Sequence, residues 1–283
     1  MKKIIPIYLM IMTSVFLITP NSAHATCSIS DADPAVVTVN DNSCSVQPAS
    51  YGITMYKMYL CTAEPTAPTT SAAGVYTSCN LVLSSDAGSR VDMTGSGAAG
   101  SFPGATFTRP PPATYTHGYI LLDNVFYVKY AAKFNESKEG SKAGTDNGVF
   151  CATEEGTGTE AGASTSCGSS AITAGEWGAQ LTTFEGGSCT TTMTESNLAG
   201  TGNNITGVLE TSAGLRTSDC SDIDKLAGIQ SFGTPIVVTK DLKSLNIAFQ
   251  VSAGMTIWEN GVTPPVINMG SGPFQAIITT TDY

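Results

Sequence analysis

Residues 109–134 constrain the fold of this chain more than any other stretch, because they have the pattern of two strands joined by a tight turn. The three consecutive prolines at 110–112 lack backbone donors and fix φ, so they hold the chain extended and prevent a helix before Tyr115. Asp123-Asn124 lies between two apolar runs and tolerates positive φ, which favours a two-residue turn. The sequence therefore predicts an antiparallel hairpin and an all-β fold class.

The predicted turn also determines which side chains share a face of the hairpin. With Leu122 opposite Val125, the second face carries Gly118 opposite Lys129. The first face, which we expect to be buried, carries the remaining alternate residues: Tyr115, His117, Tyr119 and Leu121 against Phe126, Val128, Tyr130 and Ala132. On that face His117 is expected to be a buried imidazole, hydrogen-bonded to a tyrosine hydroxyl or to the backbone.

The first 25 residues have the pattern of a secretory signal peptide. Lys2 and Lys3 precede an apolar run at 4–18, and Ala23-His24-Ala25 forms a small-x-small cleavage site. The apolar run is shorter than the roughly 20 residues that a membrane-spanning helix needs, and no later stretch reaches that length. We therefore expect bacterial-type export, a mature chain that begins at Thr26, no transmembrane span, and a secreted or cell-surface location.

All eight cysteines follow the predicted cleavage site, and an even number of cysteines in an exported chain indicates disulfides. Pairing between sequence neighbours is favoured because short polar loops close most easily. The expected pairs are Cys27 with Cys44, Cys61 with Cys79, Cys151 with Cys167, and Cys189 with Cys220. The chain has no Cys-x-x-Cys pair and only His117 remains after cleavage, so we expect no cofactor, no zinc site and no redox site.

The composition is acidic but only weakly charged. The chain carries 13 Lys and Arg against 23 Asp and Glu, and loss of Lys2 and Lys3 gives the mature protein a formal charge of −12. Such a chain repels nucleic acid, so no nucleic-acid partner is expected. Charged residues make up 13% of the sequence, against about a quarter in typical proteins, and Gly, Ser, Thr and Ala replace them. This surface chemistry is typical of secreted β-proteins and surface filaments.

Residues 135–147 form the most charged and least apolar stretch, and they divide the chain. We interpret 26–134 as an N-terminal β-sandwich module, 135–147 as a linker or exposed loop, and 148–283 as a C-terminal β-rich module. The predicted fold is a disulfide-stapled β-sandwich, with the halves either separate or closing one common core. Residues 51–61 are apolar on both faces, as expected of a central strand.

Residues 221–230 are predicted to form one short helix. Ser221 is a suitable N-cap with Asp224 three residues later, and Ile223, Leu226, Ala227 and Gln230 recur at helical spacing. The nearby Asp219, Asp222 and Asp224 also raise the alternative of a calcium site. They lack the glycine and the closing glutamate of a calcium-binding hand, so acids in a first helical turn explain them better and no metal is predicted.

A Pro-Pro-x-Thr-Tyr sequence introduces the strand that begins near Tyr115. With the preceding long strand, polar loop and short strand, this segment resembles secreted prealbumin-like β-sandwich modules, which use a Pro-Gly-Thr-Tyr turn at that point. Here Ala113 stands where the glycine would be. The resemblance covers about residues 51–130 and implies a β-sandwich fold without implying an activity.

The inventory of catalytic groups is thin. Glu154 and Glu155 could in principle act as the paired carboxylates of a glycosidase, but that chemistry needs an acid and a base held about 5 to 10 Å apart by rigid elements. They lie in a Gly/Thr/Ser-rich stretch that predicts a solvated loop. The chain has no Gly-x-Ser-x-Gly, HExxH or phosphate-loop motif. We therefore expect a protein that is not an enzyme.

Two functional hypotheses follow from these patterns. The first is a secreted structural or adhesive cell-surface protein, such as a filament subunit, that associates with itself or with an extracellular polymer. Strands near the chain ends, 36–39 and 274–281, would then be edges, and Phe274, Ala276 and Ile278 would fill a groove in a neighbouring copy. The alternative is a module that binds glycans or a small ligand through Trp177 and Trp258.

Overall fold

The computed structural model describes residues 26–39, 42–93, 102–144, 146–159, 162, 164–184, 188–197 and 200–283. The predicted signal peptide lies outside the described residues. The fold is all-β, as the sequence predicts, and it is a disulfide-stapled β-sandwich. No helix in the described part of the chain is long and apolar enough to cross a membrane.

The described part of the chain contains twenty strands. The first ten are β1 (Ser28–Ile29), β2 (Val36–Thr38), β3 (Ser43–Val46), β4 (Ser50–Cys61), β5 (Cys79–Asp92), β6 (Thr106–Phe107), β7 (Ala113–Asp123), β8 (Val125–Lys129), β9 (Ala131–Gly140) and β10 (Gly148–Thr153). The second ten are β11 (Gly156–Thr159), β12 (Thr165–Gly168), β13 (Trp177–Gln180), β14 (Thr192–Glu195), β15 (Asn204–Glu210), β16 (Lys225–Val238), β17 (Leu242–Gln250), β18 (Met255–Glu259), β19 (Val266–Ser271) and β20 (Gln275–Asp282).

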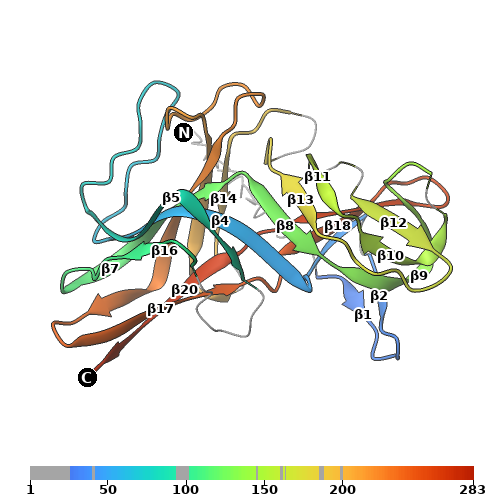
Figure 1. Cartoon of the computed structure of the whole chain (residues 1–283), viewed down its shortest axis with the longest axis horizontal. Helices are drawn as coiled ribbons and strands as arrows, with labels where there is room; N and C mark the ends of the chain where they lie inside the picture. The colour runs from blue at the N-terminus through green and yellow to red at the C-terminus, as the bar shows by residue number, and fades with distance from the viewer. Residues whose placement is uncertain are drawn as a thin grey trace, which may run out of the picture.

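The strands form three sheets. A ten-stranded sheet has the order β11-β13-β8-β4-β7-β16-β15-β14, with β5 and β6 attached beside β4. An eight-stranded sheet has the order β1-β2-β9-β19-β18-β3, with β10 and β12 attached beside β9. Figure 1 shows β4 and β8 running across the middle of the molecule, the eight-stranded sheet at the right-hand end, and the two-stranded sheet of β17 and β20 at the lower left.

The predicted hairpin at 109–134 is wrong: β7 and β8 do not pair with each other. Both pair antiparallel with β4. Because β5 occupies one edge of β4, β7 and β8 follow one another along its other edge. A two-residue hairpin turn of this type needs positive φ, and Asn124 is not among the described residues that have it. Instead Asn124 is buried and bonds to Leu181 through its main-chain carbonyl oxygen and its side-chain amide.

Because β7 and β8 are one bent strand, the predicted division into a buried and an exposed face also fails. Leu122, Phe126 and Val128 pack in the main core. Tyr119 packs in a second cluster with Val208, Ala227 and Ile229. Both faces of β7 are therefore covered, as in a central strand.

The predicted helix at 221–230 is also wrong. Residues 225–230 form the first half of β16, which pairs with β15 on one side and β7 on the other. Most of these side chains are buried, from Leu226 to Gln230. Two neighbouring strands thus supply backbone partners that outweigh a weak local helix signal. Asp219 accepts a hydrogen bond from the Ser221 amide, so the expected N-cap lies in a turn.

The expected linker begins within a strand. Residues 135–140 are the second half of β9, which pairs with β10, β2 and β19. Strands from both predicted modules also share each large sheet, since β7 pairs with β16 and β3 pairs with β18. These hydrogen bonds join the two modules, and their separate unfolding stays a prediction that limited proteolysis can test.

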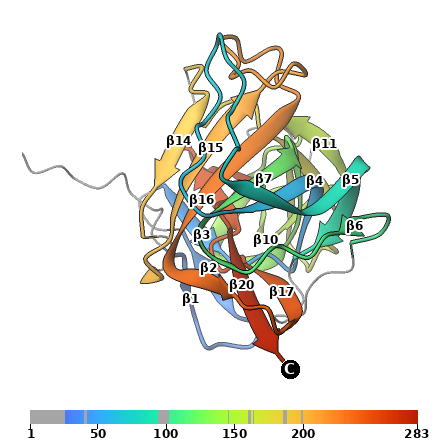
Figure 2. The same ribbon diagram turned by 90° about the vertical axis from the view of Figure 1, so that its left-hand side faces the viewer.

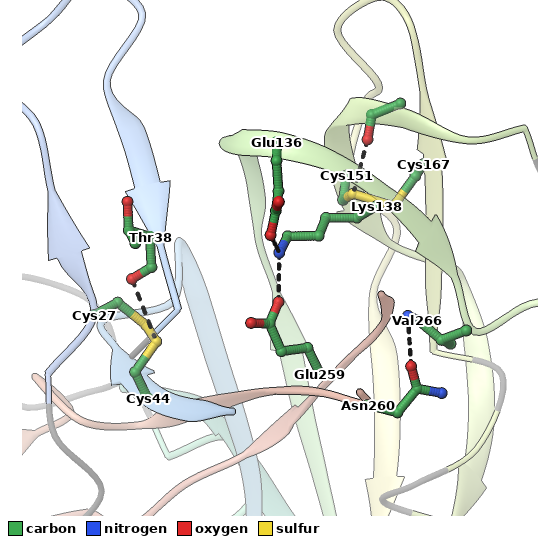
Figure 3. A network of polar contacts seen from close by, with 11 residues as sticks. Cys27, Thr38, Cys44, Glu136, Lys138, Cys151, Cys167, Glu259, Asn260 and Val266 are labelled. Atoms are coloured by element: carbon green, nitrogen blue, oxygen red, sulfur yellow. Dashed lines mark hydrogen bonds and ion pairs between the residues drawn. A yellow bond between two sulfur atoms is a disulfide. The ribbon is translucent and has the colours of Figure 1, made fainter. Parts of the chain in front are cut away.

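All four predicted disulfides are confirmed. Cys61–Cys79 joins opposite positions of β4 and β5, and Cys151–Cys167 joins opposite positions of β10 and β12. Cys27–Cys44 fastens the described N-terminus to β3, as Figure 3 shows. Cys189–Cys220 connects the segments that precede β14 and β16. Three of the four bridges therefore span only 16 to 18 residues of chain.

Two turns are closed by local hydrogen bonds. Asn260, from the Asn-Gly pair, exchanges hydrogen bonds with Val266 at the base of the β18–β19 connection (Figure 3). At the start of β7, the Tyr115 hydroxyl donates to the carbonyl of Pro111 at 2.7 Å. This contact closes the proline-rich turn and is the same type of bond that fixes tyrosine corners in β-sandwiches.

Candidate functional site

The C-terminal strand β20 and its partner β17 form a sheet of their own, here called the C-terminal strand pair. Their antiparallel register places Gln275 opposite Gln250 and Ile278 opposite Ile247. In the described chain neither strand forms a ladder with any other. Figure 2 shows β20 beside β16, with β17 on its other side. The pair therefore packs against the ten-stranded sheet without being part of it.

Aromatic packing at the start of β20 anchors the strand pair. The Phe274 ring lies 5.7 Å from the ring of Tyr51, 6.1 Å from that of Phe126 and 6.1 Å from that of Phe249, measured between centroids. The Tyr51 side chain is fully buried, and its hydroxyl donates to the carbonyl of Gly272 at 2.9 Å. Edge-on and tilted ring pairs of this kind stabilise beyond their buried area.

Three side-chain hydrogen bonds join β20 to β16. The amide of Gln230 donates to the carbonyl of Ala276 at 2.8 Å and accepts from its N–H at 3.0 Å. The Thr280 hydroxyl donates to the carbonyl of Val237 at 3.2 Å. A glutamine side chain thus takes the place of a neighbouring strand at one position of β20.

An apolar cavity of about 260 Å³ lies between β20 and the ten-stranded sheet. Aromatic side chains contribute much of its lining: Tyr51, Tyr119, Phe126, Phe184, Phe232, Trp258 and Phe274. The β20 residues that line it are Gln275, Ala276 and Ile278. Phe274, Ala276 and Ile278, which the sequence predicts to fill a groove in a neighbouring copy, here line a cavity of their own chain, and their role between copies stays a prediction.

Glycines on three neighbouring strands shape the floor of this cavity. Gly207 of β15 lies opposite Gly228 of β16, and Gly118 lies on the adjacent β7. A Cβ on Gly207 would come within 2.9 Å of the Phe184 ring, and one on Gly118 within 3.0 Å of the Phe232 ring. The missing side chains let both rings lie directly against the sheet.

The structure separates the two tryptophans that the sequence predicts as a binding pair. Trp258 is partly exposed and lines the cavity. Trp177 is buried, and its indole covers Gly156 and Gly158 of the adjacent strand β11. Because Trp177 does not offer a face to solvent, it cannot act as a stacking platform for a glycan. That part of the predicted interaction site is wrong.

The other candidate groups lie in local contacts. His117 is half-buried, and its Nδ1 lies 2.9 Å from the hydroxyl of Thr116, whereas the sequence predicts a tyrosine hydroxyl or the backbone as its partner. Hydrogen bonds from Lys142 and Ser166 lower the pKa of Glu154, which favours its anionic form rather than a general acid. Asp222 accepts from the Thr217 hydroxyl. Within the described ranges, no group of three or more His, Cys, Asp or Glu is placed to hold a metal.

One buried carboxyl group was not singled out by the sequence. Glu210 ends β15 and is 4% exposed, and burial raises its pKa to about 7 although the charge of Lys225 opposes this shift. It adjoins the tyrosine cluster of Tyr59, Tyr76 and Tyr119, in which the rings of Tyr76 and Tyr119 are 4.2 Å apart. Burial and the nearby Glu210 raise the pKa of Tyr119 strongly.

Sequence reasoning also missed the residues that define the cavity. Gly118, Gly207 and Gly228 come from strands far apart in the chain, and Gln230 lay in the predicted helix. Their only shared sequence signal is that each interrupts an apolar strand with a small or polar residue.

No protein-family model, no curated protein and no solved structure matches this chain. The resemblance to prealbumin-like modules therefore remains an interpretation of the turn at Tyr115. Four disulfides are typical of extracellular or secreted proteins, because such bonds persist in oxidising compartments.

Proposed function

We propose that this chain is a secreted, non-catalytic structural or adhesive protein whose copies associate by exchanging the C-terminal strand β20. The signal peptide predicted in the first 25 residues, the low charge and the four disulfides support an extracellular role. The observation that carries the proposal is the position of β20. It is the last strand of the chain, it pairs only with β17 in the described structure, and it covers an apolar cavity.

The connection between β19 and β20 supports strand exchange. Only Gly272, Pro273 and Phe274 separate the two strands. Exchange of an identical element between copies is a low-cost route to association, because every contact of the closed form is reproduced between copies. Short connections under constraint promote such exchange. In a head-to-tail arrangement, each copy would donate β20 to the next and extend an open filament.

Exposed apolar side chains near this end of the molecule add to the argument. Val237 on β16 is 53% exposed, Ile277 on β20 is 41% exposed and Tyr283 is 91% exposed. Thr280 bonds to Val237, so the strands that carry these side chains lie side by side. Large exposed apolar residues gathered at one place mark interaction surfaces.

Disulfide trapping between copies tests the proposal directly. Asn246 of β17 and Thr279 of β20 are opposite and exposed. Two single variants, Asn246→Cys and Thr279→Cys, are mixed at high concentration and oxidised. Strand exchange predicts a mixed dimer on a non-reducing gel, because each β20 then lies beside the β17 of another copy.

Thr194→Cys and Thr206→Cys form the matched control. These residues face each other on β14 and β15, with Thr194 exposed and Thr206 partly exposed, but neither strand is at the chain end. Their mixture should stay monomeric under the same oxidation. If both mixtures dimerise equally, or if neither does at any concentration, association through β20 is wrong.

Deletion of residues 274–283 provides a second test. The expected product is a folded monomer that no longer assembles, with electron microscopy and light scattering as the measurements. A truncated chain that still forms polymers would contradict the proposal.

A second candidate function is the binding of a small ligand. The cavity beside Trp258 favours it, whereas the burial of Trp177 removes the support for glycan stacking.

A further inference from the structure

We infer that the cavity beneath β20 is a binding site for an uncharged aromatic molecule of one or two rings. This inference deepens the second candidate function and does not depend on strand exchange. Its basis is the combination of size, lining and charge in a single cavity of the described structure. Each of these properties restricts the class of ligand.

The size of the cavity suits a small ligand. Its volume is about 260 Å³, just below the range of about 300 to 1,000 Å³ that holds drug-sized molecules. Protein cores seldom leave voids larger than a water molecule. Water that enters this space meets mostly carbon, so its displacement by an apolar group is favourable. The cavity is therefore large enough, and apolar enough, to hold a small apolar molecule.

The lining favours an aromatic ring over an aliphatic chain. The rings of Phe184 and Phe232 come close to the sheet because Gly207 and Gly118 leave room for them. Phe274 and Trp258 contribute further rings to the cavity. Rings surrounded by rings gain offset and edge-to-face contacts that an alkyl chain does not make.

The charges around the cavity exclude anions. Among the described residues of its lining, Glu195 is the one charged side chain. Gln230 and Gln275 are neutral, and both already make hydrogen bonds within the protein. An anionic ligand would lose its hydration and meet a carboxylate rather than a cation, which is unfavourable in an apolar site. An uncharged ligand avoids that cost.

The test titrates the full chain with 2-naphthol, using calorimetry and the fluorescence of Trp258. The inference predicts saturable binding of one molecule per chain, with naphthalene-2-carboxylate weaker by about tenfold or more because its charge is buried. Naphthol that fails to saturate up to its solubility limit would overturn the inference. So would 1-decanol binding at least as tightly, because the site would then select chains rather than rings.

Two variants of β20 locate the bound molecule. Ala276→Phe places a ring inside the cavity and should weaken 2-naphthol binding by about tenfold or more. Ile277→Phe is the matched control, since this neighbouring side chain points to solvent, and its affinity should stay within about twofold. Equal losses in both variants would place the ligand elsewhere. If Ala276→Phe does not fold, Ile205→Phe on the other side of the cavity takes its place.

A locked form of the protein separates this inference from the proposed strand exchange. The double variant Asn246→Cys/Thr279→Cys, oxidised within one chain, holds β20 on its own β17. The ligand site predicts unchanged 2-naphthol affinity in this form, although assembly is abolished. Loss of binding on locking would overturn a site that is complete within one copy.

Discussion

The end of the molecule around Lys138 and the end around β20 are held together by different kinds of interaction. Near Lys138, the disulfides Cys27–Cys44 and Cys151–Cys167 fasten β3 and β12 to their surroundings (Figure 3). The strand pair of β17 and β20 contains no cysteine and is joined to β16 by the side chains of Gln230 and Thr280. Covalent links thus fix one end, while the other can open locally.

A buried ion pair also stabilises the end of the molecule around Lys138, here called the stapled end because it carries the disulfides Cys27–Cys44 and Cys151–Cys167. Lys138 of β9 is 1% exposed, and its Nζ lies 2.5 Å from a carboxylate oxygen of Glu259 at the end of β18 and 2.8 Å from one of Glu136. Strand β19 lies between β9 and β18, so the lysine bridges across it. Disulfides and a buried ion pair therefore fix the pairing of the strands around Lys138, whereas a few side-chain hydrogen bonds hold the C-terminal strand pair in place.

The largest expected effect comes from breaking this ion pair. Lys138→Ala should lower the free energy of unfolding by about 3 to 5 kcal/mol, because it leaves Glu259 partly buried without its cation. Urea denaturation followed by circular dichroism measures the change. The double variant Lys138→Met/Glu259→Met is the control, and it should recover most of the loss because it removes both charges. Similar losses in both variants would show that packing, not charge, matters here.

Glu210 should make the stability of the whole fold depend on pH. Its pKa is about 7 in the folded protein, against an ordinary value of 4.5, so the folded state holds the proton more tightly. The free energy of unfolding should therefore fall as pH rises from about 4.5 to 7, by roughly 3 kcal/mol in total.

Glu210→Gln is the matched variant for this pH dependence. It should flatten the fall between pH 4.5 and 7 and be more stable than the parent protein at pH 8. Urea denaturation across this range measures both. The opening of the C-terminal strand pair should not follow the same pH profile, because Glu210 lies opposite Lys225 at the start of β16, whereas β20 bonds to β16 at Gln230 and Val237. A variant with the parent's pH dependence would contradict the role of Glu210.

The sequence predicted the parts of the fold that depend on local chemistry. The four disulfides followed from the ease of closing short loops, and residues 51–61 showed the apolar pattern of a central strand. The failures arose where a distant partner decided the outcome. Asn124 lies at the bend between β7 and β8, where its side-chain amide donates to the carbonyl of Leu181 and its own carbonyl accepts from the Leu181 N–H. No local sequence pattern predicts that contact, because Leu181 is distant in the chain.

The candidate site was predictable only on its β20 side. Alternation in the last strand identified Phe274, Ala276 and Ile278 as one face, because strand side chains alternate with period 2. The opposite wall requires Gly207 and Gly228 to lie on paired strands, and Gly228 belongs to the segment whose local pattern predicted a helix. A cavity is a property of how strands meet, so its sequence signal is spread across the chain.

Removing the two hydrogen bonds between the Gln230 side chain and the Ala276 backbone should loosen the C-terminal strand pair without affecting the stapled end. Gln230→Leu eliminates both hydrogen bonds to Ala276 and should destabilise local closure by about 1 to 3 kcal/mol. Hydrogen exchange of the β20 amides should then accelerate, while that of β9 and β10 amides stays close to the parent rate. Uniform acceleration across both ends would mean that the molecule opens only as one unit.

The smallest effect is expected from Thr280→Val, which keeps the shape of the side chain and removes its hydrogen bond to the carbonyl of Val237. Thr280 is partly exposed, so water can replace the lost partner, and the net cost should be about 0.5 to 1 kcal/mol. Thr281→Val is the control. Thr281 is the next residue of β20 and is exposed, and in the described structure its side chain forms no hydrogen bond to β16. If β20 closes as one cooperative segment, Thr280→Val accelerates exchange at Ala276 and at Thr280 alike. Acceleration confined to the last residues of β20 would show instead that the strand frays from its end, and that the bond to Val237 does not help to retain Phe274 over the cavity.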